Sequence, residues 1–246
     1  MDEPIIKLEN IVTKYGETKV LDCVSADIYP EKITVILGGS GCGKTTMLKS
    51  ILKLHRPSSG SVKIFGRETV GLFFEEFDPI LEKIGMLFQN GALLNSISVA
   101  DNVALPLEQH TELPKSIIDK IVRVKLNLVS LGHAENLLPS ELSGGMKKRA
   151  ALSRAIALDP RILFCDEPSA GLDPITSESL DHLILKLKNQ LKMTIVIVTH
   201  ELASIHRIAD RIIFLDKGKA LFQGTLQQAK TCAIDKVTKF FEVGTF

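Results

Sequence analysis

The chain has almost no excess of charge of either sign. Its 246 residues include 30 lysines and arginines against 29 aspartates and glutamates, so the formal net charge at pH 7 is +1. A protein that binds the phosphate backbone of nucleic acid usually carries a basic patch or stripe. The charge balance therefore argues against nucleic acid as a partner.

Long hydrophobic runs are also missing. No stretch reaches the roughly 18 consecutive apolar residues that suggest a transmembrane helix. The first residues, Met1-Asp2-Glu3-Pro4, are too acidic and polar for a signal peptide. We therefore expect a cytoplasmic protein that is not itself embedded in the membrane.

Cysteine is scarce and scattered. Cys23, Cys42, Cys165 and Cys232 form no CxxC pair, and no histidine stands near them at metal-ligand spacing. They are predicted to be reduced thiols. The histidines other than His200 are predicted to lie at the surface or at element boundaries, because no metal-ligand spacing joins them.

Linkers, charge blocks, internal repeats and low-complexity tracts are absent as well, so we expect one compact unit with an attached helical lobe. Short apolar runs bounded by turn residues predict strands at Ile5–Val12, Ile33–Leu37, Val62–Phe65, Ile84–Phe88, Ile162–Cys165, Ile195–Thr199 and Ile212–Leu215. Helical periodicity marks Lys44–Leu54, Ser116–Leu131, Gly144–Leu158, Ser177–Leu191 and Glu201–Ala209. This alternation predicts an α/β fold with a wound, largely parallel sheet. Residues from about 91 to 138 have helical periodicity and no convincing strand, which predicts the helical lobe.

A glycine-rich segment follows the apolar run at Ile33–Leu37 and precedes a predicted helix. It fits the pattern G-x-x-x-x-G-K-[ST], a phosphate-binding P-loop, in the required strand-to-helix context. Glycines let the backbone N–H groups and the helix N-terminus point at phosphate oxygens, a lysine adds a positive charge, and a hydroxyl can ligate Mg²⁺. The predicted nucleotide-binding residues are Gly38, Gly39, Ser40, Gly41, Cys42, Gly43, Lys44 and Thr45, followed by Thr46.

Two carboxylates end another apolar run, Ile162–Cys165. Alone, such an acidic pair is commonly a solvated strand end. Beside a P-loop it predicts a division of labour, because phosphoryl transfer depends mainly on positioning and on charge stabilisation. Asp166 is predicted to hold Mg²⁺, and Glu167 to orient or deprotonate the attacking water.

The segment Leu142-Ser143-Gly144-Gly145-Met146 resembles the signature motif of ABC-type ATPases. The usual LSGGQ has Gln where this chain has Met146, whereas Ser143, Gly144 and Gly145 match. A serine hydroxyl, open glycine backbone and a helix N-terminus together suit an anion. The following Lys147-Lys148-Arg149 is predicted to be a mostly solvated helix face.

Other ABC positions match in chain order. By resemblance, Tyr15 is the aromatic that stacks on adenine, Gln89 is the Q-loop residue near metal and water, Asp173 is the D-loop acid, and His200 is the switch histidine that senses the γ-phosphate. Each alone has a structural interpretation, as a surface aromatic, a strand end or a helix N-terminal residue. Their order around two strong motifs favours the functional one.

The resemblance implies one ABC ATPase domain over residues 1–246, with a RecA-like core at about 1–90 and 159–224, a helical subdomain at about 91–158 and a C-terminal helical tail at about 225–246. It also implies that two chains sandwich two Mg-ATP molecules. Each ATP would lie between the P-loop of one chain and Ser143-Gly144-Gly145 of the other, and hydrolysis would move a transmembrane permease.

A narrower resemblance, to the ATPase of Mla/Mce-type lipid transporters, rests on Met146 and on four segments: Phe88–Leu94, Val99–Leu107, His110–Pro114 and Asp235–Phe241. It implies a homodimer on the cytoplasmic face of the inner membrane, permease subunits, a small regulatory subunit, a lipid-binding Mce-type protein and phospholipid trafficking. Two alternatives stay open: a transporter ATPase for another small substrate, and a soluble ABC ATPase outside transport.

The end of the chain is strongly apolar. Thr225 is predicted to cap a helix that begins at Leu226, and Val237, Phe240, Phe241 and Phe246 supply apolar side chains beyond it. Such a tail needs a partner surface. We expect it to reach a neighbouring subunit or a regulatory protein, and packing against the chain's own core is the alternative.

Overall fold

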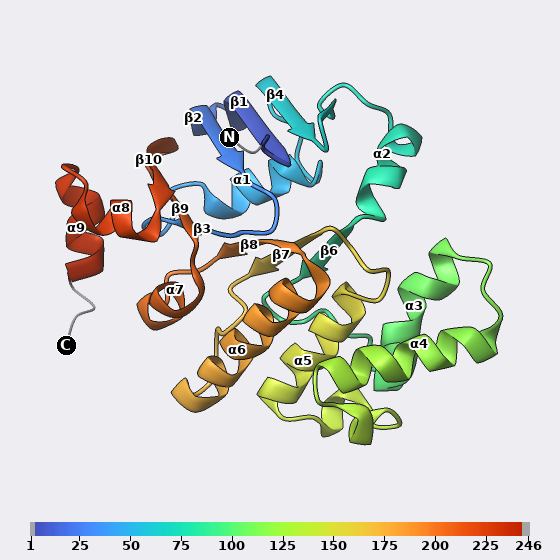
Figure 1. The fold of residues 1–246 in the computed structure, drawn as a ribbon. Helices are drawn as coiled ribbons and strands as arrows, with labels where there is room; N and C mark the ends of the chain where they lie inside the picture. The colour runs from blue at the N-terminus through green and yellow to red at the C-terminus, as the bar shows by residue number, and fades with distance from the viewer. Residues whose placement is uncertain (1–2, 243–246) are drawn as a thin grey trace. The chain divides into compact units, whose positions relative to one another are not determined.

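The computed structural model describes residues 3–242, and Figure 1 shows them as a ribbon. The chain divides into two compact units, one formed by residues 1–81 and 194–246 and the other by residues 82–193. Phe246, one of the apolar residues predicted for the tail, lies outside the described residues. The predicted partition into core, helical subdomain and tail stays a prediction.

The first unit holds two sheets. The antiparallel sheet has the order β2-β1-β4-β5, with β1 at Ile6–Tyr15, β2 at Thr18–Ile28, β4 at Ser59–Ile64 and β5 at Arg67–Glu68. The other strands of this unit run in the order β10-β9-β3-β8. They are β3 at Ile33–Leu37, β8 at Thr194–Val198, β9 at Arg211–Asp216 and β10 at Lys219–Thr225. β3 pairs in parallel with both β8 and β9, and β10 returns antiparallel to β9.

The helices of this unit are α1 at Lys44–Ile51, α2 at Phe74–Leu81, α7 at Leu202–Ile208, α8 at Leu226–Thr231 and α9 at Asp235–Glu242. The predicted cap of α8 is confirmed, because the Thr225 hydroxyl accepts from the Gln228 N–H and the Gln228 side chain accepts from the Thr225 N–H. Such a capping box satisfies two donors at the start of a helix.

The second unit contains one parallel pair, β6 at Ile84–Leu87 and β7 at Ile162–Asp166. Its helices are α3 at Val99–His110, α4 at Lys115–Leu128, α5 at Gly144–Ala155 and α6 at Pro174–Leu191, with 3-10 turns at Gly132–Ala134 and Pro139–Glu141. Figure 1 draws α3, α4 and α5 together in green and yellow. Residues 91–138 contain no strand, as the periodicity predicts.

The α/β class and the mostly parallel pairing of the central strands confirm the prediction, while the antiparallel sheet was not expected. The alternation of buried and exposed residues in its strand β2 is interrupted, because the buried residues Leu21 and Val24 are three positions apart instead of two. Cys23 between them has a left-handed φ of 54°. A bulge of this kind inserts one residue and shifts the alternation of side chains, so the run reads neither as a strand nor as a helix.

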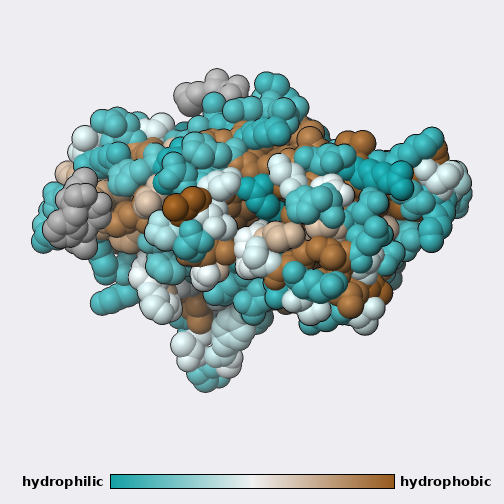
Figure 2. Space-filling view, turned by 90° about the horizontal axis from the view of Figure 1, so that it is seen from below, coloured by the Kyte–Doolittle hydropathy of each residue, from teal (hydrophilic) through white to brown (hydrophobic). Residues whose placement is uncertain are grey.

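Hydrophobic and hydrophilic side chains are interspersed on the face of the molecule that Figure 2 shows. Across residues 3–242, no helix combines the length and the apolar character needed to cross a membrane.

The C-terminal helix α9 packs on its own chain. Val237 is fully buried and Phe241 is 4% exposed. The Phe240 ring meets Phe214 of β9 edge to face at 5.5 Å, and Lys236 pairs with Asp216 at 2.6 Å. Up to Glu242 the structure thus shows packing against the chain's own core, which is the alternative that the sequence left open.

This packing predicts that Phe241→Ala lowers the free energy of unfolding by about 3 kcal/mol, because a buried aromatic leaves a cavity that the surroundings refill only in part. Urea denaturation measures the effect. Lys239→Ala is the matched control on the same helix, since its side chain is 72% exposed. A Phe241→Ala chain that unfolds like wild type but assembles poorly would contradict the packing in cis.

Candidate functional site

In the first unit, the carboxyl ends of neighbouring parallel strands bring two predicted site segments to one edge. The P-loop, Gly38–Thr45, follows directly after β3, and His200 follows two residues after β8. Parallel strands end at the same edge of their sheet, which is where α/β proteins bind ligands. His200 is exposed in the turn between β8 and α7.

The path of the P-loop explains two of its glycines. Gly38 has a φ of +146°, and a Cβ there would lie 2.1 Å from the Leu215 carbonyl oxygen of β9. At Gly43, φ is +107° and a Cβ would lie 2.6 Å from the Leu21 side chain of β2. No residue with a side chain fits these two positions without a shift of the backbone. The loop is therefore pressed against β9 and β2 at its two ends.

The start of α1 suits an anion. Its N-cap is Gly43, which offers no side chain to the first N–H groups, and its first turn holds no acidic residue. The unsatisfied N–H groups of a helix start carry partial positive charge. The Lys44 ammonium lies over the loop and donates to the carbonyl oxygens of Gly38 at 2.8 Å and Gly39 at 3.1 Å. Thr45 is exposed beside it.

Tyr15, the last residue of β1, forms a stacked pair with His55. The ring centroids are 4.3 Å apart at an interplanar angle of 26°, and Tyr15 stays 45% exposed. The His55 Nε2 also contacts the Lys14 carbonyl oxygen at 3.2 Å. From the sequence, His55 is predicted only to lie at the surface or at an element boundary, because no local pattern links it to a tyrosine 40 positions away.

In the second unit, β6 and β7 bring another set of predicted residues to one edge. Leu87 pairs with Cys165, so Gln89 follows β6 at the edge where Asp166 ends β7 and Glu167 follows it. Gln89 is exposed, and both carboxylates are half-buried. Glu167 has a left-handed φ of 46°, a conformation that costs energy in a residue other than glycine and is found at functional sites.

The cysteines are free thiols, as predicted. Cys165 lies in β7 directly before the two acids, and burial raises the pKa of its thiol to about 12. The thiol therefore stays protonated at neutral pH and is a packing residue, not a nucleophile.

The signature motif forms the start of α5. Ser143 is the N-cap, and its hydroxyl accepts from the Met146 N–H at 3.3 Å. The cap uses the backbone N–H of Met146, so the replacement of the motif glutamine by methionine leaves it in place.

The predicted D-loop residue caps a helix as well. Asp173 is the N-cap of α6 and accepts from the N–H groups of Ile175 at 3.1 Å and Thr176 at 3.0 Å. Hydrogen bonds from the Thr176 side chain and N–H hold the pKa of Asp173 below its usual value. This carboxylate has a structural task in its own chain.

The prediction that Lys147-Lys148-Arg149 forms a solvated face is wrong for two of the three residues. Lys147 is exposed, but Lys148 is only 7% exposed. Arg149 donates to the Val129 carbonyl oxygen at 2.9 Å and to the Ser179 hydroxyl at 2.8 Å. A run of cations in a sequence does not indicate which members reach backbone carbonyls elsewhere in the fold, so Lys148 was missed.

The predicted metal ligands carry the donor atoms that suit Mg²⁺. They are the Thr45 hydroxyl, the Asp166 carboxylate and the Gln89 amide oxygen. Magnesium prefers oxygen ligands and is commonly held by one or two carboxylates together with phosphate oxygens. Over the described part of the chain no three His, Cys, Asp or Glu side chains form a metal cluster. Hydroxyl, carboxylate and amide oxygens are ligand types that suit a magnesium ion held together with nucleotide phosphates.

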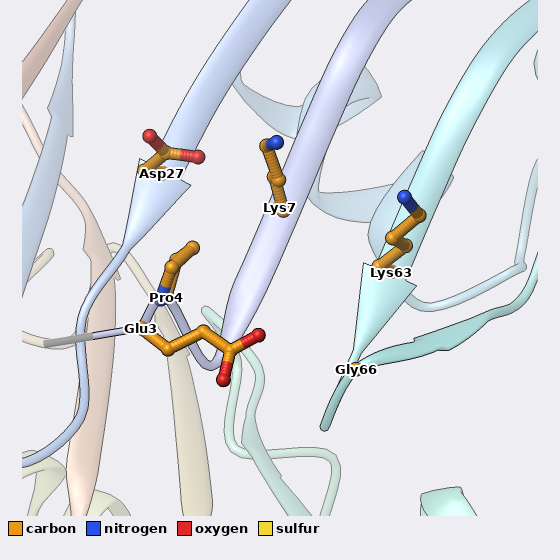
Figure 3. A pocket seen from close by; sticks show the side chains of 6 residues that line it. All are labelled: Glu3, Pro4, Lys7, Asp27, Lys63 and Gly66. Atoms are coloured by element: carbon orange, nitrogen blue, oxygen red, sulfur yellow. The ribbon is translucent and has the colours of Figure 1, made fainter.

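The antiparallel sheet of the first unit carries a hollow of about 360 Å³ (Figure 3). Asp27, Lys7 and Lys63 line it from neighbouring strands, with Lys7 paired to Asp27 on one side and to Lys63 on the other. Glu9 forms ion pairs with Lys7 at 2.8 Å and Lys63 at 3.4 Å, which offsets the repulsion between the two cations. Cross-strand pairing explains the charged residues that line the hollow. None of its lining residues is a predicted site residue.

Known proteins match the chain over nearly its whole length. The sequence profile of the ABC transporter family covers residues 21–170. The intermembrane phospholipid transport system ATP-binding protein MlaF of Haemophilus influenzae is 39% identical over 98% of this chain and 92% of its own. The probable ribonucleotide transport ATP-binding protein mkl of Mycobacterium leprae is 41% identical over 84% of this chain, a match that spans 60% of that protein.

A solved structure agrees with the fold and the enzyme class. The ATP-binding cassette MJ0796, a dimer in a post-hydrolysis state with ADP and Pi, is 33% identical and superposes with a TM-score of 0.81. The superposition covers 90% of this chain and 98% of that one. With a family profile over more than half of its residues and relatives matched along nearly all of it, the chain belongs to the ABC transporter family, as an ATP-binding subunit that hydrolyses ATP.

Proposed function

We propose that this ATPase drives phospholipid trafficking between membranes of the bacterial envelope, as a homodimer on the cytoplasmic face of the inner membrane. The observation that carries the proposal is the extent of the match to MlaF, which covers 92% of that protein, against 60% for mkl. Because the match covers 98% of this chain, it extends into the C-terminal segment. ABC transporter ATPases work with transmembrane permeases, and a small regulatory subunit and a lipid-binding Mce-type protein are the further partners we propose.

The nucleotide phosphates would lie on the backbone N–H groups of the P-loop and on the start of α1. Lys44 already holds its ammonium over the loop at the carbonyl oxygens of Gly38 and Gly39. It would turn from these oxygens to the phosphates. Thr46 lies in the same first turn of α1, and its hydroxyl would also contact the nucleotide. Tyr15, which stacks on His55, would cover the adenine.

The proposed metal ligands are Thr45, Asp166 and Gln89. A bound Mg²⁺ would neutralise charge on the phosphate oxygens. The chain's own residues orient the reaction: Glu167 at the end of β7 accepts the proton of the attacking water, Gln89 helps to place that water, and His200 donates to the γ-phosphate.

ATP would join two copies of the chain. The start of α5 offers a second helix end for an anion, where Ser143 and Gly144 are exposed and Gly145 is half-buried. The γ-phosphate held on the P-loop of one chain would be its ligand. Asp173, the N-cap of α6, belongs to the same unit.

This mechanism predicts that Glu167→Gln keeps ATP affinity but lowers turnover on the order of 10²-fold or more, because an amide retains the shape of the side chain but cannot accept a proton. Equilibrium nucleotide binding and phosphate release measure the two effects. Near-normal hydrolysis by Glu167→Gln would show that Glu167 is not the base.

Lys44→Ala should instead weaken ATP binding, since it removes the charge held against the phosphates. Equilibrium nucleotide binding measures this effect, and an unchanged affinity together with an unchanged rate would contradict it.

The substrate is tested by isolating the chain with its permease from native membranes and identifying the molecule bound to the complex by mass spectrometry. Phospholipid is the expected result. The alternative, an ATPase for another small substrate, is favoured by the 41% identity to a protein named for ribonucleotide transport. A bound ribonucleotide, amino acid or other small solute in place of lipid would establish that alternative. Isolation of the active ATPase on ribosomes or DNA, with no permease, would establish the non-transport alternative instead.

A further inference from the structure

One face of α5 is turned toward the backbone of two functional loops in its own unit. Lys148, Ala151 and Arg154 follow one another at spacings of three residues, which puts them on one side of the helix. The Ala151 methyl would lie 3.3 Å from a Cβ at Gly91. The Arg154 guanidinium donates to the carbonyl oxygens of Gly91 and Ala92, each at 2.8 Å. This face therefore holds the loop that follows β6.

Lys148 connects that loop to a second one. Its ammonium donates to the Gln89 carbonyl oxygen and, at 3.3 Å, to the Glu167 carbonyl oxygen. A buried ammonium has three donors and no acceptor, so it is stable only where oxygens face it. Burial lowers the pKa of Lys148, and nearby Cys165, Glu167 and Asp166 act in the opposite direction.

Both loops contain residues in the left-handed conformation, at Glu167 in one and at Gly91 and Ala92, the contacts of Arg154, in the other. Glu167 has a φ of 46°, Gly91 a φ of 74° and Ala92 a φ of 52°. A left-handed residue other than glycine persists only where its surroundings hold it. The Glu167 carbonyl oxygen accepts from the Ala170 N–H at 3.2 Å and from the Lys148 ammonium. Lys148 thus stabilises the turn that sets the direction of the Glu167 side chain.

We propose that Lys148 is a positioning residue for ATP hydrolysis. It fixes the backbone of Glu167 and Gln89 in position relative to the signature helix α5. The proposal rests on the proposed function, in which Glu167 is the base and Gln89 helps to place the water. Lys148 contacts the backbone carbonyl oxygens of these two residues and would act through them. It lies on the helix that Ser143 caps, so a displacement of the signature motif would be transmitted to both loops.

Packing alone does not account for a lysine at this position. Its neighbours Ala150 and Leu152 fill buried positions of α5 with apolar side chains. A buried cation carries a desolvation cost that an apolar residue of the same length avoids. The cost is offset here by the two carbonyl oxygens, and both belong to residues of the proposed reaction.

The test compares Lys148→Met with Lys147→Met in the full chain. Methionine keeps the length of the side chain and removes every donor, and Lys147 is the exposed neighbour on the same helix. We expect kcat to fall on the order of 10-fold or more for Lys148→Met, because small displacements of a catalytic group are costly. The equilibrium affinity for ATP should stay within about twofold, and Lys147→Met should keep both values.

Two further variants separate positioning from general stability. Lys148→Gln restores one N–H donor group and should recover part of the kcat; it also carries the comparison if Lys148→Met does not fold. Arg154→Met loosens the Gly91 and Ala92 carbonyls but does not touch Glu167, so its loss in kcat should be smaller. A role in stability alone would shift the thermal midpoint and ATP affinity together and leave kcat per folded chain unchanged.

Unchanged kcat in Lys148→Met, an equal loss in Lys147→Met, or an equal loss in Arg154→Met would each overturn the proposal. The proposed function fails by a different result, namely normal turnover in Glu167→Gln. If Glu167→Gln is inactive and Lys148→Met is not impaired, the base assignment stands and the positioning role is wrong.

Discussion

Parallel pairing of strands is the constraint on which the rest of the site depends. β3 lies between β8 and β9 in the first unit, and β6 pairs with β7 in the second. Every strand in such a pair ends at the same edge, so the loops that follow them are neighbours whatever their distance in sequence. In the first unit these loops contain the P-loop residues and His200, and in the second unit they contain Gln89 and the two acids. The close approach of Gly38 to β9 shows how tightly one of them is fitted to the strands that carry it.

The signature helix α5 adds a second constraint within its own unit. Its side chains donate hydrogen bonds to backbone carbonyl oxygens in the loops that contain left-handed residues. Lys148 and Arg154 together reach four carbonyl oxygens, at Gln89, Gly91, Ala92 and Glu167. Burying Lys148 and half-burying Arg154 cost free energy, and so do the left-handed turns. The hydrogen bonds from the two cations to the carbonyl oxygens offset both costs. A helix that begins with the signature motif and ends against the loop after β6 gives the motif a physical connection to the base that it would help to control.

Local patterns were enough to predict most of the strands, the cap of α8 and the P-loop, because strand periodicity, capping and glycine-rich turns are encoded in neighbouring residues. They did not reveal β2, whose alternation is broken at Cys23, or the stack of His55 on Tyr15. The solvated face expected at Lys148 and Arg149 was wrong for the same reason. Their partners are 19 or more positions away, and only the fold brings them together. The tail illustrates a further limit: its apolar side chains indicate burial but not which surface buries them.

The proposed mechanism requires one ATP to be shared between the P-loop of one chain and the start of α5 in a second. Size-exclusion chromatography with light scattering tests this sharing, with and without MgATP, on Glu167→Gln and on Glu167→Gln combined with Ser143→Arg. We expect an ATP-dependent dimer for Glu167→Gln and a monomer that still binds ATP for the double variant, since the arginine would occupy the place of the γ-phosphate. A dimer that persists in the double variant would contradict it.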